Sequence, residues 1–379
     1  MQTKITLIFL FFIFITSCQQ NSTQTELNNS ILLDIDFNDS NLIHVKDFID
    51  QVTFVPLETN DSCLISRIAR VHSIDTLLFV HDIKTNSINV FNEKGKHLYN
   101  ISKKGQGPGE YISLSKFLID ELKKQLIIYD ADSKKLLYYT LNGKYIKEIN
   151  KFGQNVIIRD IINLPDGNFL CYTPDYTKNI EYQGIFKLDS LGNPDKVYFN
   201  SEKYPILLKA TESYFNKLSD GTVTIDAGDY NKIFHFKKDS LKCFISYITN
   251  RKSPTDYPNI DFESTLPMTP IMEITEKENY ILTTWYDFNE EKAYQALYSK
   301  KTQKLEFGKF KFNNDLTTGI PSLEVHFNDP NKLLNVIYGY QIPEILESKM
   351  VSEEIKEILR KVPDPENANP VLEIQHLKK

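Results

Sequence analysis

The chain has 379 residues and a formal net charge of −6; 41% of the residues are apolar and 25% are charged. These proportions are typical of a soluble globular protein with ample core-forming residues, and they exclude a disordered chain and a membrane bundle. The cations are mostly lysine and form no basic stripe, so no nucleic-acid partner is expected.

Residues 1–17 have the pattern of a signal peptide. Lys4 precedes an apolar run over residues 5–15, interrupted only by Thr6, which is too short to span a bilayer and is followed by small residues. The run ends in Phe-Ile-Thr-Ser-Cys at 14–18, which resembles a bacterial lipobox. The resemblance implies cleavage before Cys18, lipidation of Cys18 and anchoring to a membrane. A plain signal peptide that happens to end near a cysteine is the alternative.

Residues 18–30 are polar and predict a flexible tether between the lipid and the folded domain, which we place at 31–379. Gln19 follows the cysteine, which favours the outer membrane by analogy with Gram-negative sorting. No acidic cluster marks export to the surface. The expected location is therefore the cell envelope, with the periplasmic and surface faces both open.

The strongest fold signal is a segment that occurs twice without a gap, at 77–101 and 125–149. Asp82 and Gly95 of the first copy recur as Asp130 and Gly143 in the second, 48 positions later. Each copy reads as three apolar strands joined by two turns, in which Asp bonds the following backbone and Gly supplies a positive φ. Such a period without a helix predicts an all-β fold, the β-propeller.

Weaker copies continue the pattern along the chain. They lie at 166–192, 220–236, 280–307 and from 333 onward. The region from about residue 52 therefore divides into six blades of four antiparallel strands, and the length disfavours seven.

The C-terminal region predicts one helix and a closing strand. Apolar residues follow helical spacing over about 344–361, between Pro343 and Pro363, and alternate along 371–377. We interpret the helix as an insertion outside the last blade. The terminal strand would complete a shared blade and hide the edge between the first and last blades.

The block at 105–111, Gly-Gln-Gly-Pro-Gly-Glu-Tyr, superficially resembles a nucleotide loop. Pro108 breaks the required spacing, Glu110 places negative charge where phosphate would lie, and strands follow instead of a helix. A rigid crossing between blades, with Tyr111 docked in it, is the preferred interpretation. A ligand-binding role for Glu110 and Tyr111 is the second option.

Other chemistry-bearing residues give weak signals. No Gly-x-Ser-x-Gly or paired-histidine motif occurs, and His81 and His235 read as hydrogen-bonded structural residues within strands. The acidic turn at 130–132 could bind Ca²⁺, but an Asx-turn explains it, so no metal and no cofactor is expected. Trp285, the single tryptophan, could stack on a sugar or peptide, but a lone tryptophan is more often part of the core.

The cysteines of the folded region predict no disulfide framework. Cys63, Cys171 and Cys243 are odd in number, and the last two lie within apolar strand patterns.

Three segments together carry a family resemblance: 54–59 (Phe-Val-Pro-Leu-Glu-Thr), the 105–111 block, and 369–372 (Asn-Pro-Val-Leu). With them, the chain resembles the six-bladed β-propeller lipoproteins of Bacteroides-type bacteria, which are distantly similar to NHL-repeat propellers. The resemblance spans nearly the whole mature chain. It implies the fold and an envelope location, but no agreed substrate or catalytic residues.

Two classes of function stay open. The favoured one is a binding module that holds a glycan, a peptide or a partner protein in the central funnel or on a loop face, because catalytic motifs are missing. The alternative is a hydrolase or lyase with acidic residues around the funnel; scaffold or sensor work accounts for the rest. Convergent carboxylates in the funnel would favour the enzyme.

Overall fold

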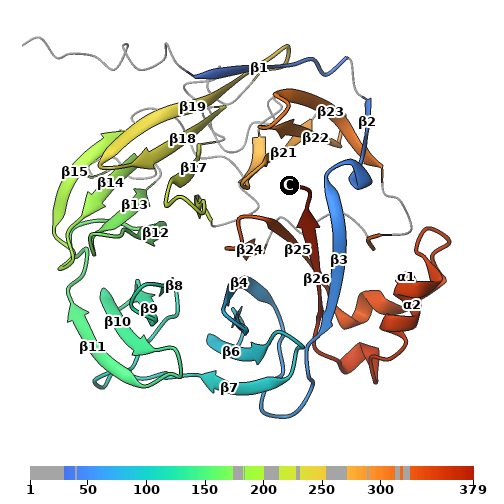
Figure 1. Ribbon diagram of the computed structural model, residues 1–379. Helices are drawn as coiled ribbons and strands as arrows, with labels where there is room; N and C mark the ends of the chain where they lie inside the picture. The colour runs from blue at the N-terminus through green and yellow to red at the C-terminus, as the bar shows by residue number, and fades with distance from the viewer. Residues whose placement is uncertain are drawn as a thin grey trace, which may run out of the picture.

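The computed structural model describes residues 30–38, 41–173, 182, 184–199, 213–227, 231–252, 271–287, 290–311, 316–318 and 325–379. The predicted signal peptide, Cys18 and nearly all of the tether lie outside these residues. Six sheets stand in a ring around a central axis (Figure 1), which confirms the six-bladed β-propeller.

Each of the first five blades has four consecutive antiparallel strands, and the sixth has three strands in the described residues. Blade 1 contains β4 (Ile68–Ile74), β5 (Leu77–Asp82), β6 (Ser87–Asn92) and β7 (His97–Ile101); blade 2, β8 (Lys116–Asp120), β9 (Gln125–Asp130), β10 (Lys135–Thr140) and β11 (Tyr145–Asn150); blade 3, β12 (Asp160–Asn163), β13 (Phe169–Thr173), β14 (Gly184–Leu188) and β15 (Pro194–Phe199). Blade 4 contains β16 (Phe215–Lys217), β17 (Val223–Ala227), β18 (Lys232–Lys237) and β19 (Ser240–Thr249); blade 5, β20 (Ile271–Glu276), β21 (Tyr280–Asp287), β22 (Lys292–Ser299) and β23 (Lys304–Lys311); blade 6, β25 (Lys332–Ile337), β26 (Val371–Leu377) and β3 (Ile49–Pro56).

The duplicated turn residues have the roles that their recurrence predicts. The Asp130 carboxylate accepts hydrogen bonds from the backbone N–H groups of Asp132 and Ser133, both at 3.1 Å, which is an Asx-turn. Gly95 and Gly143 have φ of +80° and +78°, as tight hairpins require. The repeat therefore encodes turn chemistry.

The apolar core is distributed between neighbouring blades. One cluster of buried side chains lies between each adjacent pair, such as the cluster joining Phe79 and Ile88 of blade 1 to Phe117 and Ile128 of blade 2. The other pairs are joined in the same way. Both faces of each blade are thus buried, which explains why the strands read as continuous apolar runs.

Two strands near the N-terminus extend blades 4 and 5, and the sequence did not predict them. β1 (Ile31–Ile35) pairs in parallel with β19, and β2 (Asn41–His44) pairs in parallel with β23. A Cβ on Gly308 of β23 would lie 1.8 Å from the Asn41 carbonyl oxygen, so glycine lets β2 approach. The two strands cover outer edges that would otherwise be open.

Blade 6 closes the ring by pairing the chain's two ends. β26 lies between β25 and β3, and Val371 is opposite Pro56 in the antiparallel register. The predicted closing strand at 371–377 is confirmed to the residue. A short strand, β24 (His326–Phe327), pairs in parallel with β4 of blade 1 and joins the blades on the axial side.

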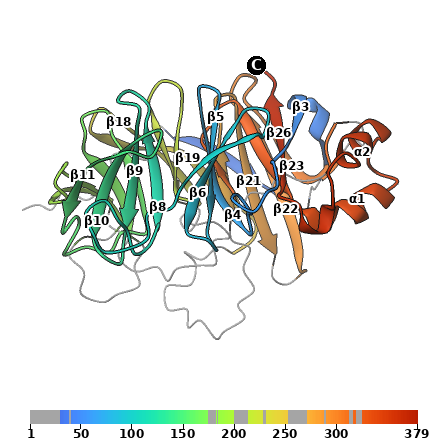
Figure 2. The ribbon, with the colours of Figure 1, turned by 90° about the horizontal axis from the view of Figure 1, so that it is seen from below.

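The helical insertion consists of two helices instead of the single predicted one. α1 (Ile342–Glu347) and α2 (Glu353–Leu359) pack outside blade 6, beside β3 (Figures 1 and 2). Ser348 is extended, and the Ser352 hydroxyl accepts a hydrogen bond from Ile355 N–H to cap α2. Short 3₁₀ turns occur at Val45–Asp47, Gly339–Gln341 and Pro365–Asn367. Among the described residues, none of the helices is long and apolar enough to cross a bilayer.

Candidate functional site

The innermost strands and their hairpin turns enclose a cavity of about 540 Å³ on the axis, which we call the funnel. Blade 1 contributes Arg70 and His72, and the innermost hairpins of blades 2, 3 and 4 contribute residues 118–123, 162–165 and 215–221. His326 of β24 and the segment after it complete the wall. The volume falls within the range of small-molecule sites.

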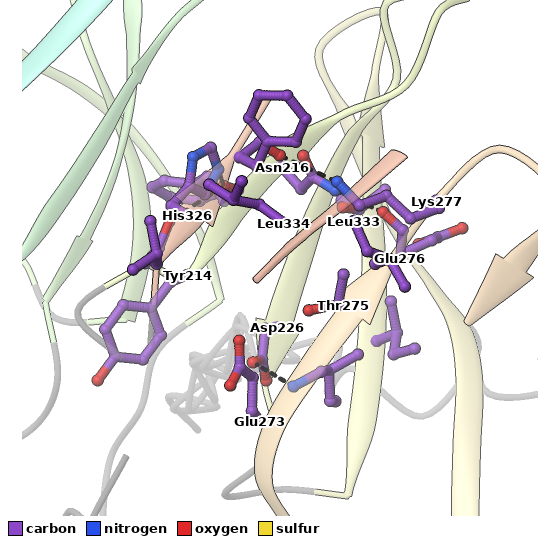
Figure 3. A pocket seen from close by; sticks show the side chains of 17 residues that line it. Tyr214, Asn216, Asp226, Glu273, Thr275, Glu276, Lys277, His326, Leu333 and Leu334 are labelled. Carbon is purple, nitrogen blue, oxygen red and sulfur yellow. Dashed lines mark hydrogen bonds between the residues drawn. The ribbon is translucent and has the colours of Figure 1, made fainter. Parts of the chain in front are cut away.

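A smaller pocket of about 60 Å³ lies in the wall between blades 4, 5 and 6 (Figure 3). It shares Phe215, Asn216 and His326 with the funnel. The buried side chains of Asp226 and Glu273 lie at one end of it, and Asp226 accepts a hydrogen bond from Ile274 N–H at 3.0 Å. This space has room for only a few water molecules and is too small for a sugar ring or a peptide.

An ion pair on the innermost strands of blades 2 and 3 is internally neutral. Lys116 Nζ lies 2.8 Å from Asp160 Oδ1, and both residues are buried. Asp160 Oδ2 also accepts hydrogen bonds from the backbone N–H groups of Tyr214 and Phe215. The carboxylate therefore joins three blades, and the Lys116 charge is balanced where it stands.

Arg70 and His326 lie side by side, because the parallel pairing of β4 with β24 places them opposite one another. Only 8% of Arg70 is exposed, and its Nη2 donates to Ser213 Oγ at 3.2 Å. Burial lowers the pKa of the Arg70 guanidinium, and the charge of Asp160 opposes the shift. Arginine still carries its charge at neutral pH.

His326 presents a hydrogen-bond acceptor. Its Nε2 lies 3.2 Å from the Phe215 carbonyl oxygen, so Nε2 carries the proton. Its Nδ1 is buried and has no hydrogen-bond partner among the described residues. Burial, and then the charges of Arg70 and Lys116, lower the pKa of His326 well below its usual value, so the ring is neutral.

His72 and Asn328 form the next layer toward the opening. Asn328 Nδ2 lies 3.1 Å from His72 Nε2, and the Asn328 amide also binds both backbone groups of Ser73. Glu121 Oε1 lies 3.5 Å from the same His72 nitrogen. Burial lowers the pKa of His72, while its hydrogen bond lowers the pKa of Glu121.

At the rim, acidic side chains have cationic partners. Asp120 pairs with Lys123 at 3.4 Å, and Asp220 pairs with Lys237. Lys217, which is exposed, forms no ion pair with another described residue. The rim thus offers carboxylate oxygens as acceptors with little net charge.

Lys277, at the edge of the smaller pocket, joins blade 5 to the β24 segment. Its Nζ donates to the carbonyl oxygens of Phe327 at 2.9 Å and Asp329 at 2.8 Å. Burial lowers the pKa of Lys277 to about 8. Both donated bonds go to backbone carbonyls, which identifies a structural role.

The three predicted ligand residues do not line the funnel. Tyr111 is fully buried between blades 1 and 2, and its hydroxyl donates to the Asn86 carbonyl oxygen at 3.0 Å. Glu110 binds Gly107 N–H of its own loop at 2.9 Å. Trp285 is fully buried between blades 4 and 5, with Nε1 donating to Thr283 Oγ1. Their ligand-binding roles stay predictions, and the geometry gives each of them a packing role.

The histidines that were predicted to be structural differ from one another. His235 Nε2 lies 2.9 Å from Glu276 Oε2, which confirms a hydrogen-bonded role. His81 is buried, but its Nε2 has no partner in the described part of the chain. Burial lowers the pKa of His81 to about 4.

The three cysteines of the folded region, Cys63, Cys171 and Cys243, are buried and free. Within the described residues, no three His, Cys, Asp or Glu side chains come together in a way that could hold a metal ion.

Sequence reasoning missed Arg70, His72 and His326. The first two carried a signal, because they alternate on a mostly apolar strand and therefore share one face. His326 carried none, since its strand has two residues and no counterpart in the repeat.

Comparison with known proteins supports the fold. The family model described as Domain of unknown function (DUF4934) matches residues 29–375. A protein from Bacteroides fragilis, described as exported, has a solved structure with a TM-score of 0.73 and 18% identity; the match covers 92% of this chain and 100% of the other. A DUF4221 family member from Bacteroides vulgatus has a TM-score of 0.53 and 10% identity, with 87% and 97% of the two chains covered. No curated protein matches the sequence.

Proposed function

Because the chain belongs to the family described as Domain of unknown function (DUF4934), we propose that it is a binding module held at the cell envelope, with its ligand in the funnel. The observation that carries this proposal is the funnel itself. Its volume of about 540 Å³ suits a ligand of two or three sugar rings or a short peptide.

The funnel wall is built for recognition. Side chains from four blades and β24 converge on one space, and they offer a buried cation, amide groups and carboxylate acceptors. Polar groups placed on strands and tight hairpins are held rigidly, so binding orders few side chains. A glycan or a peptide is the expected ligand class, and a partner protein would insert a loop or a terminus.

Lipidation of Cys18 would place this module on a membrane. The lipobox-like sequence before Cys18 supports this part of the proposal, as does the likeness to a Bacteroides protein described as exported. A Cys18→Ala variant should leave the membrane fraction when cells are fractionated and should lose incorporation of labelled palmitate. Retention of both properties would refute the lipid anchor.

The hydrolase alternative has one supporting observation, the pair of buried carboxylates Asp226 and Glu273. Their pocket of about 60 Å³ admits water but no substrate, and the larger funnel has its acids on the rim. We therefore rank catalysis second. An Asp226→Asn variant that binds normally but loses a measured hydrolytic activity would reverse this ranking.

The binding proposal is tested by filling the funnel. The full chain, purified in detergent, is screened by thermal shift and calorimetry against neutral and acidic oligosaccharides and short peptides. Asn163→Trp places a large ring in the funnel wall, whereas Ser190→Trp places the same ring at an exposed turn of the same blade. We expect Asn163→Trp alone to abolish binding. Hits that bind both variants equally would place the ligand elsewhere and refute the proposal.

A further inference from the structure

Among the described residues that line the funnel, Arg70 is a buried charge without a counter-ion of its own. Arg70 is more than nine-tenths buried and forms no ion pair with any other described residue. The nearby carboxylate of Asp160 is already held by Lys116 and two backbone N–H groups. An uncompensated buried charge is costly, and a bound anion would offset that cost.

Arg70 also lies below the rim. β4 begins at Ile68 and ends at the hairpin beside the mouth of the funnel, so Arg70 lies two residues farther from the mouth than His72. His72, which contacts Glu121 and Asn328, lies on the same strand nearer to the hairpin end of the funnel. The guanidinium of Arg70 would therefore contact the part of a ligand that lies deepest in the funnel.

We propose that the ligand carries a carboxylate at its inner end, bound by the guanidinium of Arg70, on a polyhydroxylated body: an acidic sugar. This inference rests on the proposed function, since it requires a ligand in the funnel. A planar guanidinium and a carboxylate match in bidentate geometry.

The charge balance favours a carboxylate over a phosphate. Lys116 is neutralised by Asp160, and His72 and His326 are neutral because burial lowers their pKa values. One unit of positive charge therefore remains at the inner end of the funnel, which matches a monoanion. A phosphate dianion would leave a charge unpaired.

The remaining wall favours hydroxyl groups. Asp120, Glu121 and Asp220 line the rim and present carboxylate oxygens that accept hydrogen bonds, while the lysines beside them keep the net charge of the rim small. His326, beside Arg70, adds a buried Nδ1 acceptor. A ligand with a single anionic group and many hydroxyl donors satisfies both regions.

The test uses small probes on the full chain: D-galacturonate, D-galactose, acetate and inorganic phosphate. A ligand of this size at ordinary ligand efficiency has a Kd on the order of 1 mM. In calorimetry, galacturonate should bind at least about tenfold more tightly than galactose, because only it makes the charged contact. Phosphate should bind more weakly than galacturonate.

Two arginine variants form a matched pair. Arg70→Gln should weaken galacturonate binding at least about tenfold and leave galactose binding unchanged. Arg67→Gln removes the same charge from an exposed residue outside the funnel and should change neither. If Arg70→Gln fails to fold, Arg70→Lys, which keeps the charge but loses the bidentate geometry, should weaken galacturonate binding by a smaller factor, and the preference of the unaltered chain for galacturonate over galactose remains the deciding measurement.

Equal binding of galacturonate and galactose, tighter binding of phosphate, or no binding of galacturonate would each overturn the carboxylate inference. The proposed function would still hold if another oligosaccharide or peptide from the wider panel binds the unaltered chain and fails to bind the Asn163→Trp variant. If Asn163→Trp blocks nothing in that panel, the funnel itself is not a binding site and both proposals fail.

Discussion

Asn369 fastens the closing strand to the start of the first blade, so its replacement should destabilise the whole ring. Its side chain is 2% exposed; Oδ1 accepts from Ile65 N–H at 2.7 Å, and Nδ2 donates to the carbonyl oxygens of Glu58 and Cys63, both at 2.7 Å. Asn369→Ala leaves the Ile65 N–H and the Cys63 carbonyl without their partners, whereas the Glu58 carbonyl keeps its hydrogen bond from the Cys63 thiol. Each unpaired group costs about 1–3 kcal/mol, and partial rehydration brings the expected loss in the free energy of unfolding to about 2–4 kcal/mol.

Urea unfolding measures this loss through the fluorescence of Trp285, the single tryptophan, which is fully buried between blades 4 and 5. The control is Asn367→Ala, two residues upstream, whose side chain is exposed and binds only Asp364 in the described structure. This control should cost less than about 0.5 kcal/mol. A loss for Asn369→Ala within about 1 kcal/mol of the control would refute the view that this amide closes the ring.

Three further predictions concern stability. Burial lowers the pKa of His81 from 6.5 to about 4, so the unfolded chain binds the proton first as the pH falls from 6.5 to 4. The free energy of unfolding should therefore drop by about 3 kcal/mol over this range. In unfolding measured as a function of pH, a His81→Gln variant should show a smaller loss of stability at acidic pH. The folded pKa of Lys277 is about 8 against an unfolded value of 10.5, so stability should rise between pH 8 and 10, and Lys277→Met should remove the rise; a flat profile for the parent chain would contradict it. Gly95→Ala and Gly221→Ala share a φ near +80°, but the new Cβ lies 2.1 Å from the Pro56 carbonyl oxygen only in the first, so thermal unfolding should show Gly95→Ala to be worse by more than about 1 kcal/mol.

The parts of the fold that the sequence predicted are those with local signals. Asp82 and Gly95 recur as Asp130 and Gly143 because each hairpin needs the same Asx-turn and the same positive φ, whatever surrounds it. The closing strand was readable because its alternation follows a proline. Each of these features depends on residues within a few positions of one another.

The missed features depend on distant partners. β1 and β2 add to existing sheet edges in parallel, without a hairpin, so no turn marks their pairing. The helical pattern runs through Ser348 without interruption, because apolar spacing alone does not reveal that the backbone there becomes extended. In both cases the surrounding structure decided the outcome.

The side chains that line the funnel could not be predicted either, because they too come from segments far apart in the sequence. Arg70 and His326 are separated by most of the chain and meet because β24 pairs with β4. Repetition identifies what the blades share, whereas these residues occur where the blades differ. The sequence supported the expectation of a central site but could not name the side chains in it.

The two edge strands near the N-terminus also constrain the order in which this protein can be completed during synthesis. Ile31 cannot pair until Ile245 has been synthesised, and the same holds for Asn41 with Gly308 and for Pro56 with Val371. At a translation rate of about 5–20 residues per second, the first strand stays without its partner for roughly 10 to 40 s. The strands at 31–35 and 41–44 are therefore among the last to be paired, although they are made before the strands that they join.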